Sequence, residues 1–137
     1  MTNPRYMLDT NICIYLRRRR PAGVVHRFAR LEPGLAIISA ITYGELRYGA
    51  EKHAERDRLL RGLEELIGLI PVQSLPAPAG DAYGQVRAAL ERQGHVIGSN
   101  DLWIAAHALA AGLTLVTNNE REFRRVPGLM VENWAAE

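Results

Sequence analysis

Short, almost wholly apolar runs separated by helical segments constrain the fold of this chain more than any other feature. Runs this short and apolar are typical of strands buried on both faces of a parallel sheet. They span residues 5–8, 35–38, 114–116 and 129–131, with a weaker fifth at 69–73. Pro71 in the fifth run favours an edge strand, because proline lacks the N–H that an inner strand donates. The pattern predicts an α/β fold with a central, mostly parallel sheet and helices on both faces.

Apolar residues at helical spacing occupy the segments between these runs. The expected helices span residues 11–18, 22–31, 39–48, 54–67, 79–93 and 99–111. Ser39 is the expected N-cap of the third helix. Ser99 or Asn100 is expected to cap the sixth, which ends at Gly112. The 137 residues contain no repeat, linker or low-complexity tract, so we expect one domain over residues 1–137.

Basic side chains in this chain are almost all arginines. Of the 17 lysines and arginines, Lys52 is the only lysine, and the formal net charge is +2. The planar guanidinium fork suits phosphate, so a phosphate-bearing partner is one interpretation. A codon bias of the source genome explains the excess at least as well.

The single cysteine and the hydropathy pattern bear on the compartment. Cys13 excludes an intrachain disulfide, and its apolar neighbours indicate a buried thiol in a reducing environment. No run approaches the roughly 20 apolar residues that a membrane span needs. The N-terminus lacks a signal-peptide pattern. We therefore expect a cytoplasmic protein that does not associate with membranes.

Three carboxylates are placed so that they reach one edge of the predicted sheet. Asp9 follows the first run, Glu45 lies about two turns into the helix after the second run, and Asp101 is in the first turn of the last helix. Singly, each acid is more often a helix cap or a partner of the helix dipole. Gathered together, they repel one another unless a cation neutralises them. Without a Cys/His set, the arrangement indicates a hard divalent cation, Mg²⁺ or Mn²⁺.

The polar segment after the run at 114–116 reaches the same edge. Thr117 and Asn119 are candidates to hydrogen-bond a water or a phosphate there. Glu122, or Glu120 in its place, is a candidate fourth carboxylate. The alternative interpretation is a polar turn with solvated charges.

The motifs around these acids resemble those of the PIN-domain family, in particular the VapC-type toxin ribonucleases of bacterial type II toxin–antitoxin pairs. The resemblance covers nearly the whole chain and rests on residues 7–15, 41–46, 98–106 and 117–134. It implies a three-layer α/β fold, an Mg²⁺- or Mn²⁺-dependent endoribonuclease activity, a cognate VapB-type antitoxin that inhibits it, and a homodimer. It also implies that Asp9, Glu45 and Asp101 carry the metal, and it suggests tRNA as the substrate.

The fourth acid of the site departs from the family pattern. Asn119 stands where many relatives have Asp, and Glu122 stands where others have an acid. Whether one metal ion or two bind is therefore left open. The implied catalytic set is Asp9, Glu45, Asp101, Asn119 and Glu122.

The four histidines are scattered, and no Ser-His-Asp or Cys-His arrangement is evident. His107 lies six residues after Asp101, roughly 600° around a helix, so it points away from that acid. We interpret His107 as a structural or surface residue. This favours metal-assisted hydrolysis of a phosphodiester by water, which leaves 3′-hydroxyl and 5′-phosphate ends.

Two arginine clusters are candidates for RNA contact. The first lies at the end of the first helix, where the helix dipole favours cations, and consists of Arg17, Arg18, Arg19 and Arg20. The second lies near the acidic edge and consists of Arg121, Arg124 and Arg125. Solvated charge, or contact with an acidic antitoxin tail, is the alternative for both.

A leucine-rich stripe over residues 54–67, with Tyr43, Leu46 and Tyr48, is a candidate wall for an antitoxin helix. Core packing or a dimer interface is the commoner explanation of such a stripe.

Other classes fit the sequence less well. A haloacid-dehalogenase-like phosphatase needs a second Asp where this chain has Asn11, and a receiver domain needs a late Lys, whereas Lys52 is the only lysine. The remaining alternative is a catalytically silent PIN-like module that binds RNA or a partner. Clustered carboxylates facing a polyanion argue against that alternative.

Overall fold

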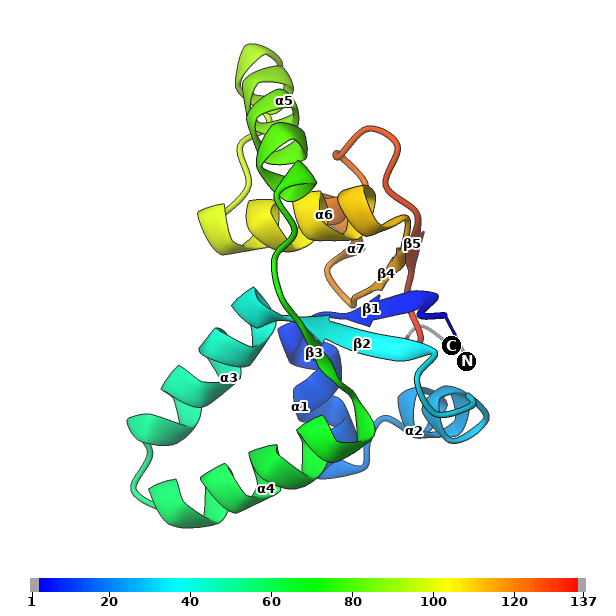
Figure 1. The fold of residues 1–137 in the computed structure, drawn as a ribbon, viewed down its shortest axis with the longest axis vertical. Coiled ribbons are helices and arrows are strands. Elements are labelled where there is room, and N and C mark those ends of the chain that lie inside the picture. Colours follow the sequence, from blue (N-terminus) through cyan, green and yellow to red (C-terminus); the bar gives the residue numbers. More distant parts are fainter. Residues whose placement is uncertain (1–2, 136–137) are drawn as a thin grey trace.

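A five-stranded sheet in the order β3-β2-β1-β4-β5 forms the centre of the molecule (Figure 1). The structure is a computed structural model that describes residues 3–135. Its strands are β1 (Tyr6–Leu8), β2 (Ala36–Ser39), β3 (Val72–Gln73), β4 (Thr114–Val116) and β5 (Val131–Glu132). Each strand of this sheet runs parallel to its neighbours. The predicted α/β class is confirmed, and β3 takes the edge position expected of the segment with Pro71.

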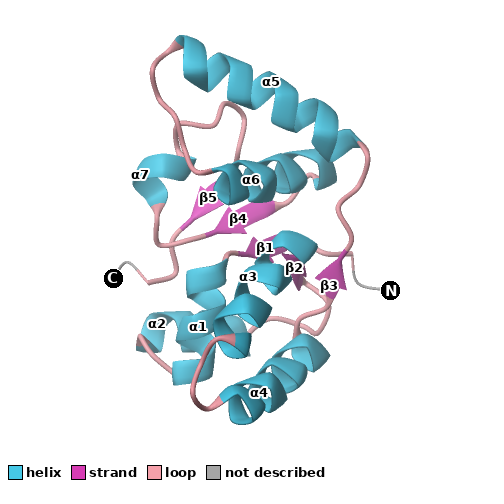
Figure 2. Ribbon diagram, turned by 90° about the vertical axis from the view of Figure 1, so that its left-hand side faces the viewer, coloured by secondary structure: helices cyan, strands magenta, loops and turns pink. Residues whose placement is uncertain are grey.

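Helices cover both faces of the sheet. They are α1 (Thr10–Arg18), α2 (Ala22–Ala29), α3 (Ala40–Glu51), α4 (Arg56–Leu69), α5 (Pro78–Arg92), α6 (Ser99–Ala111) and α7 (Glu120–Phe123). Helices α1 to α4 lie on one side and α5 to α7 on the other, which gives the three layers that were expected (Figure 2). Within residues 3–135, none of the helices is long and apolar enough to cross a lipid bilayer.

Alternate residues of the inner strands are buried in opposite layers. Tyr6 and Leu8 of β1 pack in the core on the α1 side, whereas Met7 packs in the core with α5 and α6. In β2, Ile38 and Ile37 divide in the same way. Complete burial of such a side chain stabilises the fold by roughly 1.5–3 kcal/mol. Both faces are apolar for this reason, and the strands show no polar alternation in the sequence.

The parallel arrangement brings the ends of β1, β2 and β4 to one edge. Asp9 follows β1, Ser39 ends β2 and Thr117 follows β4. Ser39 caps α3 as predicted, since its Oγ accepts a hydrogen bond from the Ile41 N–H at 3.1 Å. Ligand sites of open α/β sheets lie at this edge.

The start of α6 differs from the prediction. Gly98 is its N-cap and no side chain caps the helix, so the expected cap at Ser99 or Asn100 was wrong. The Asn100 amide instead contacts Glu45. Gly112 ends α6 in the left-handed conformation as predicted, with a φ of 68°.

Other boundaries also shift. Helix α3 continues to Glu51 rather than ending at Tyr48, and β5 begins at Val131 rather than at residue 129. Residues 120–123, for which a turn was one interpretation, form the short helix α7. Cys13 is fully buried as expected, and this burial raises the pKa of its thiol.

Candidate active site

The first carboxylate of the site, Asp9, is held by two neighbouring elements. It caps α1, and its Oδ1 accepts a hydrogen bond from the Ile12 N–H at 3.0 Å. Its Oδ2 accepts a hydrogen bond from the hydroxyl of Thr117 after β4. Asp9 and Thr117 are both buried. The pairing of β1 with β4 therefore fixes the orientation of this carboxylate.

Glu45, in the second turn of α3, is held by the starts of two other helices. Thr10, the first residue of α1, donates its hydroxyl hydrogen to Oε1 at 2.5 Å. The Asn100 amide nitrogen on α6 lies 3.4 Å from Oε2. These contacts direct Glu45 toward the edge where Asp9 lies.

The loop between β4 and α7 orients a fourth carboxylate. Asn119 donates its backbone N–H to Thr117 Oγ1 at 2.9 Å and its amide to Glu122 Oε2 at 3.2 Å. Glu120 has different partners, since it accepts a hydrogen bond from Asn133 and forms an ion pair with Arg124 at 2.7 Å. Of the two candidates, Glu122 is therefore the one turned toward the site.

Asp101, in the first turn of α6, experiences the charge of all the other acids. Burial, followed by the negative charges of Glu45, Glu122 and Asp9 in that order, raises its pKa to about 6. We name Asp9, Glu45, Asp101 and Glu122 the carboxylate cluster. The four side chains come from four different elements and meet at one edge of the sheet.

Opposing effects act on the pKa of Asp9. Burial raises its pKa, the bonds from Thr117 and Ile12 oppose that rise, and the charge of Glu45 adds to it. The hydrogen bonds favour the ionised form, whereas burial and the neighbouring acids disfavour it. The hydrogen bonds to Asp9 thus favour its ionised form but do not compensate its negative charge.

The chemistry of the cluster fits a hard divalent cation. Among residues 3–135, no Arg or Lys forms an ion pair with any of the four acids. No three His, Cys, Asp or Glu side chains of the described residues are spaced to hold a metal as they stand. Hydrogen bonds to Thr10, Asn119 and Thr117 occupy the carboxylates instead. Uncompensated oxygen donors are the ligands that Mg²⁺ and Mn²⁺ prefer.

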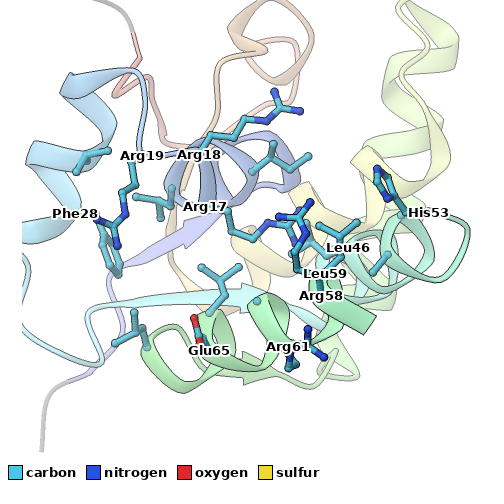
Figure 3. Close-up of a pocket in the computed structure, with 18 of the residues that line it drawn as sticks. Arg17, Arg18, Arg19, Phe28, Leu46, His53, Arg58, Leu59, Arg61 and Glu65 are labelled. Carbon is cyan, nitrogen blue, oxygen red and sulfur yellow. The ribbon is translucent and has the colours of Figure 1, made fainter. Parts of the chain in front are cut away.

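A groove of about 1010 Å³ leads away from the cluster between α1, α2, α3 and α4. Glu45 lines it, together with Arg17, Arg18 and Arg19 of the first arginine cluster. Figure 3 shows these arginines with Arg58 and Arg61 of α4, which the sequence did not single out. The groove is therefore acidic at the end where Glu45 lies and basic along the wall that the arginines form.

The two arginine clusters are not brought together in this groove. Neither Arg20 nor Arg121 nor Arg124 lines it. Arg124 is paired with Glu120, and Arg125 Nη1 lies 3.5 Å from the Val96 carbonyl oxygen.

The apolar part of the groove matches the predicted stripe in part. Leu46, Leu59 and Leu66 line it. Tyr43 packs against the core, and Tyr48 is exposed outside the groove, so these two tyrosines do not form its wall.

His107 is a structural residue, as interpreted from its position relative to Asp101. It is fully buried and hydrogen-bonds to Ser39 and Gln73 rather than to the carboxylate cluster. Burial lowers its pKa, which favours the neutral imidazole.

The sequence did not identify Thr10 and Asn100 as partners of Glu45. Each stands next to an acid of the cluster in the chain, Thr10 after Asp9 and Asn100 before Asp101. That adjacency was the available signal, because a short polar residue at the start of a helix can reach across to a neighbouring helix.

A family model and curated relatives match this chain over most of its length. The family model described as "PIN domain" matches residues 6–129. The "tRNA(fMet)-specific endonuclease VapC" of Shigella flexneri is 47% identical over 131 residues, which cover 96% of this chain and 98% of the relative. "Ribonuclease VapC2" of Haemophilus influenzae is 43% identical over 130 residues, 95% of this chain and 98% of the relative.

Solved structures match over the same length. DNA-bound VapBC from Salmonella typhimurium superposes with a TM-score of 0.90 at 42% identity, covering 96% of this chain and 98% of that one. VapBC2 from Rickettsia felis bound to a promoter DNA fragment gives a TM-score of 0.85 at 37% identity, covering 94% and 98%. The chain therefore belongs to the PIN-domain family and, within it, to the VapC ribonucleases.

Proposed function

We propose that this chain is a divalent-metal-dependent endoribonuclease that cleaves tRNA as the toxin of a type II toxin–antitoxin pair. Membership of the VapC ribonucleases supports the ribonuclease and toxin assignment. One observation carries the metal dependence: four carboxylates from different elements gather at one sheet edge without a paired cation. The name of the Shigella relative supports tRNA as the substrate. Action on tRNA implies a cytoplasmic location.

Asp9, Glu45 and Asp101 would hold Mg²⁺ or Mn²⁺, with Glu122 and Asn119 beside them. The bound ion supplies an activated water and stabilises charge on the phosphodiester. Thr117 and the Ile12 N–H keep Asp9 oriented and favour its ionised form. Thr10 and Asn100 orient Glu45 in the same way. Attack of water on phosphorus with loss of the 3′ oxygen leaves 3′-hydroxyl and 5′-phosphate ends.

The first arginine cluster binds the RNA backbone in the groove that leads to the carboxylate cluster. Nη1 of Arg17 is buried and has no hydrogen-bond partner among the described residues. A buried guanidinium N–H without an acceptor is costly. Because Arg17 lines the groove, its guanidinium can turn outward to a phosphate oxygen, which supplies that acceptor close to Glu45. Arg121 and Arg124 are secondary candidates, and Arg124 must first leave Glu120.

Cleavage of total tRNA tests the proposal. The parent chain with Mg²⁺ is expected to give discrete cuts, which EDTA abolishes. Asp101→Asn is expected to lower the rate by about 10²–10³-fold, because it removes a ligand of the cation that would stabilise charge on the reacting phosphate. Asp81→Asn, an exposed acid of α5, is the matched control and should cleave like the parent.

Two results would count against the proposal. Cuts that survive EDTA or Asp101→Asn would exclude the metal mechanism. Binding of tRNA without cleavage under any metal would favour the silent RNA-binding module instead.

Salt dependence tests the role of the arginines. Replacing Arg17–Arg20 by Gln in the Asp101→Asn background should weaken tRNA binding and flatten its dependence on salt. Each lost phosphate contact removes roughly 0.7–0.9 from the slope of log K against log salt. An unchanged slope would remove these residues from the RNA interface.

A VapB-type antitoxin occupies the same groove and thereby blocks access to the acids. Leu46, Leu59 and Leu66 offer an apolar seat for an amphipathic helix, and the surrounding arginines suit acidic side chains. Leu59→Ala, which shortens the apolar seat without adding charge to the arginine-lined groove, should weaken binding of the cognate antitoxin more than tenfold while tRNA cleavage stays within twofold. Equal loss of both would contradict a groove seat. A homodimer, implied by the family resemblance, is checked by the sedimentation of the purified chain.

A further inference from the structure

A buried polar network lies between α6, the sheet and the start of α3. His107 of α6 is fully buried, with Nδ1 2.9 Å from Ser39 Oγ and Nε2 3.0 Å from Gln73 Oε1. Ser39 ends β2 and caps α3, and Gln73 ends β3. We name these three residues the His107 network. It joins one helix to the ends of two strands and to the first turn of a second helix.

One arrangement of hydrogens satisfies both ring nitrogens of His107, the Ser39 hydroxyl and Gln73 Oε1. Ser39 Oγ already accepts a hydrogen bond from the Ile41 N–H, so its own hydrogen is free to go to His107 Nδ1. The ring then carries its hydrogen on Nε2 and donates it to Gln73 Oε1. This is the neutral imidazole, which agrees with the lowered pKa of the buried ring. The network therefore has one preferred tautomer and one preferred geometry.

The two helices that the network joins carry two of the clustered acids. Glu45 lies six residues after Ser39 on α3, and Asp101 lies six residues before His107 on α6. Six residues of helix span about 9 Å. Over that length, a rotation of about 6° between the helices moves a carboxylate by about 1 Å. A misplacement of about 1 Å in a reacting site can cost about 10²-fold in rate.

The contact between α3 and α6 next to the clustered acids is weak. There, Asn100 Nδ2 lies 3.4 Å from Glu45 Oε2 in an exposed position. The fully buried link between His107 and Ser39 is shorter and is shielded from water. The buried link is therefore the stronger restraint on how α3 and α6 meet.

We propose that His107 is a positioning residue that sets the spacing of Glu45 and Asp101 through Ser39 and Gln73. The inference rests on the proposed metal site, because that spacing matters for a shared cation. Partners that orient metal ligands typically change metal affinity by about 10–100-fold when lost. His107 itself does not touch substrate or metal.

Mn²⁺ titration followed by electron paramagnetic resonance tests the proposal on the folded, purified chain. His107→Leu should raise the Mn²⁺ dissociation constant about tenfold. His107→Asn, which keeps a polar atom facing Ser39, should stay within threefold of the parent. Leu90→Ala is the control, because it opens the same α5–α6 core without touching the network. It should lower the melting temperature but leave Mn²⁺ affinity within twofold.

Backbone amide NMR of the metal-free chain provides a second, independent readout. His107→Leu should shift the amide signals of Glu45 and Asp101, and Leu90→Ala should leave both in place. A His107→Leu affinity within twofold of the parent, or equal to that of Leu90→Ala, would overturn the positioning role. A parent that binds no Mn²⁺ would overturn the metal site, and the amide shifts would then decide the positioning role alone.

Discussion

The carboxylate cluster includes residues of α3 and α6, and the His107 network includes a residue of α6 and the N-cap of α3, yet their polar groups are satisfied to opposite degrees. In the His107 network, each ring nitrogen has a partner within 3.0 Å. In the cluster, burial and the charges of Glu45, Glu122 and Asp9 raise the pKa of Asp101 to about 6. A satisfied network rigidifies a fold, whereas uncompensated buried charge destabilises it until a ligand arrives. The His107 network thus holds the elements of the site in place, whereas the carboxylate cluster is left for the proposed cation to neutralise.

Substitution in the satisfied region should have the largest effect on stability. His107→Leu leaves Ser39 and Gln73 without their partner, and each unpaired buried group costs about 1–3 kcal/mol. We expect the free energy of unfolding to fall by about 3 kcal/mol in urea titrations. A loss under about 1 kcal/mol would mean that water replaces the ring without penalty.

Metal should stabilise the unsatisfied region by a similar amount. At a Mn²⁺ concentration of 100 times the dissociation constant, the folded state gains about 2.7 kcal/mol. For a chain of this length, that gain raises the melting temperature by roughly 8 °C. Asp101→Asn should lose most of this shift, and Asp81→Asn should keep it. Equal shifts in both variants would indicate that the metal binds elsewhere.

Removing one acid without metal should stabilise the fold, the opposite sign to His107→Leu. Asp101→Asn removes a carboxylate whose ionised form is disfavoured first by burial and then by repulsion from Glu45, Glu122 and Asp9. Because Asp101 is only partly buried, solvent screening reduces the gain to about 1 kcal/mol at pH 7.5. Chemical unfolding in EDTA measures it. A destabilised variant would show that Asp101 is a structural cap rather than a site residue.

The stability that Asp101→Asn adds should depend on pH. This pH dependence is the smallest of the expected effects. The folded-state pKa of Asp101, about 6, lies above the ordinary value of 3.8, so the folded chain holds this proton more tightly than the unfolded chain. The contribution of Asp101 to the stability of the metal-free parent should therefore fall as pH rises from about 4 to 6. The full penalty persists above that window. The difference between the parent and Asp101→Asn should vanish near pH 4, and a difference that is flat with pH would contradict the assignment.

The sequence predicted the fold class because the inner strands β1, β2 and β4 are apolar on both faces and apolar residues recur at helical spacing between them. Asp9, Glu45 and Asp101 were singled out because each stands just after a strand or near the start of a helix, and the family resemblance implied their role as metal ligands. Residues whose partners lie far along the chain were harder to assign. His107 and Gln73 are 34 residues apart, and no local spacing connects them.

The cap of α6 shows the same limit at short range. Ser99 and Asn100 carry the composition of a cap, yet the Asn100 amide reaches Glu45, 55 residues away, and Gly98 takes the cap position. A tertiary contact thus outweighs a local preference. The choice of Glu122 over Glu120 likewise depended on the fold, since Arg124 and Asn133 hold Glu120 away from the cluster.

Anomalous diffraction from crystals of the chain soaked in Mn²⁺ tests the central claim most directly. The account predicts a manganese peak at the carboxyl edge of the sheet, in contact with oxygens of Asp9 and Asp101, while the His107 network stays unchanged. A peak only at other acids, or an empty cluster at a Mn²⁺ concentration that supports tRNA cleavage, would contradict it.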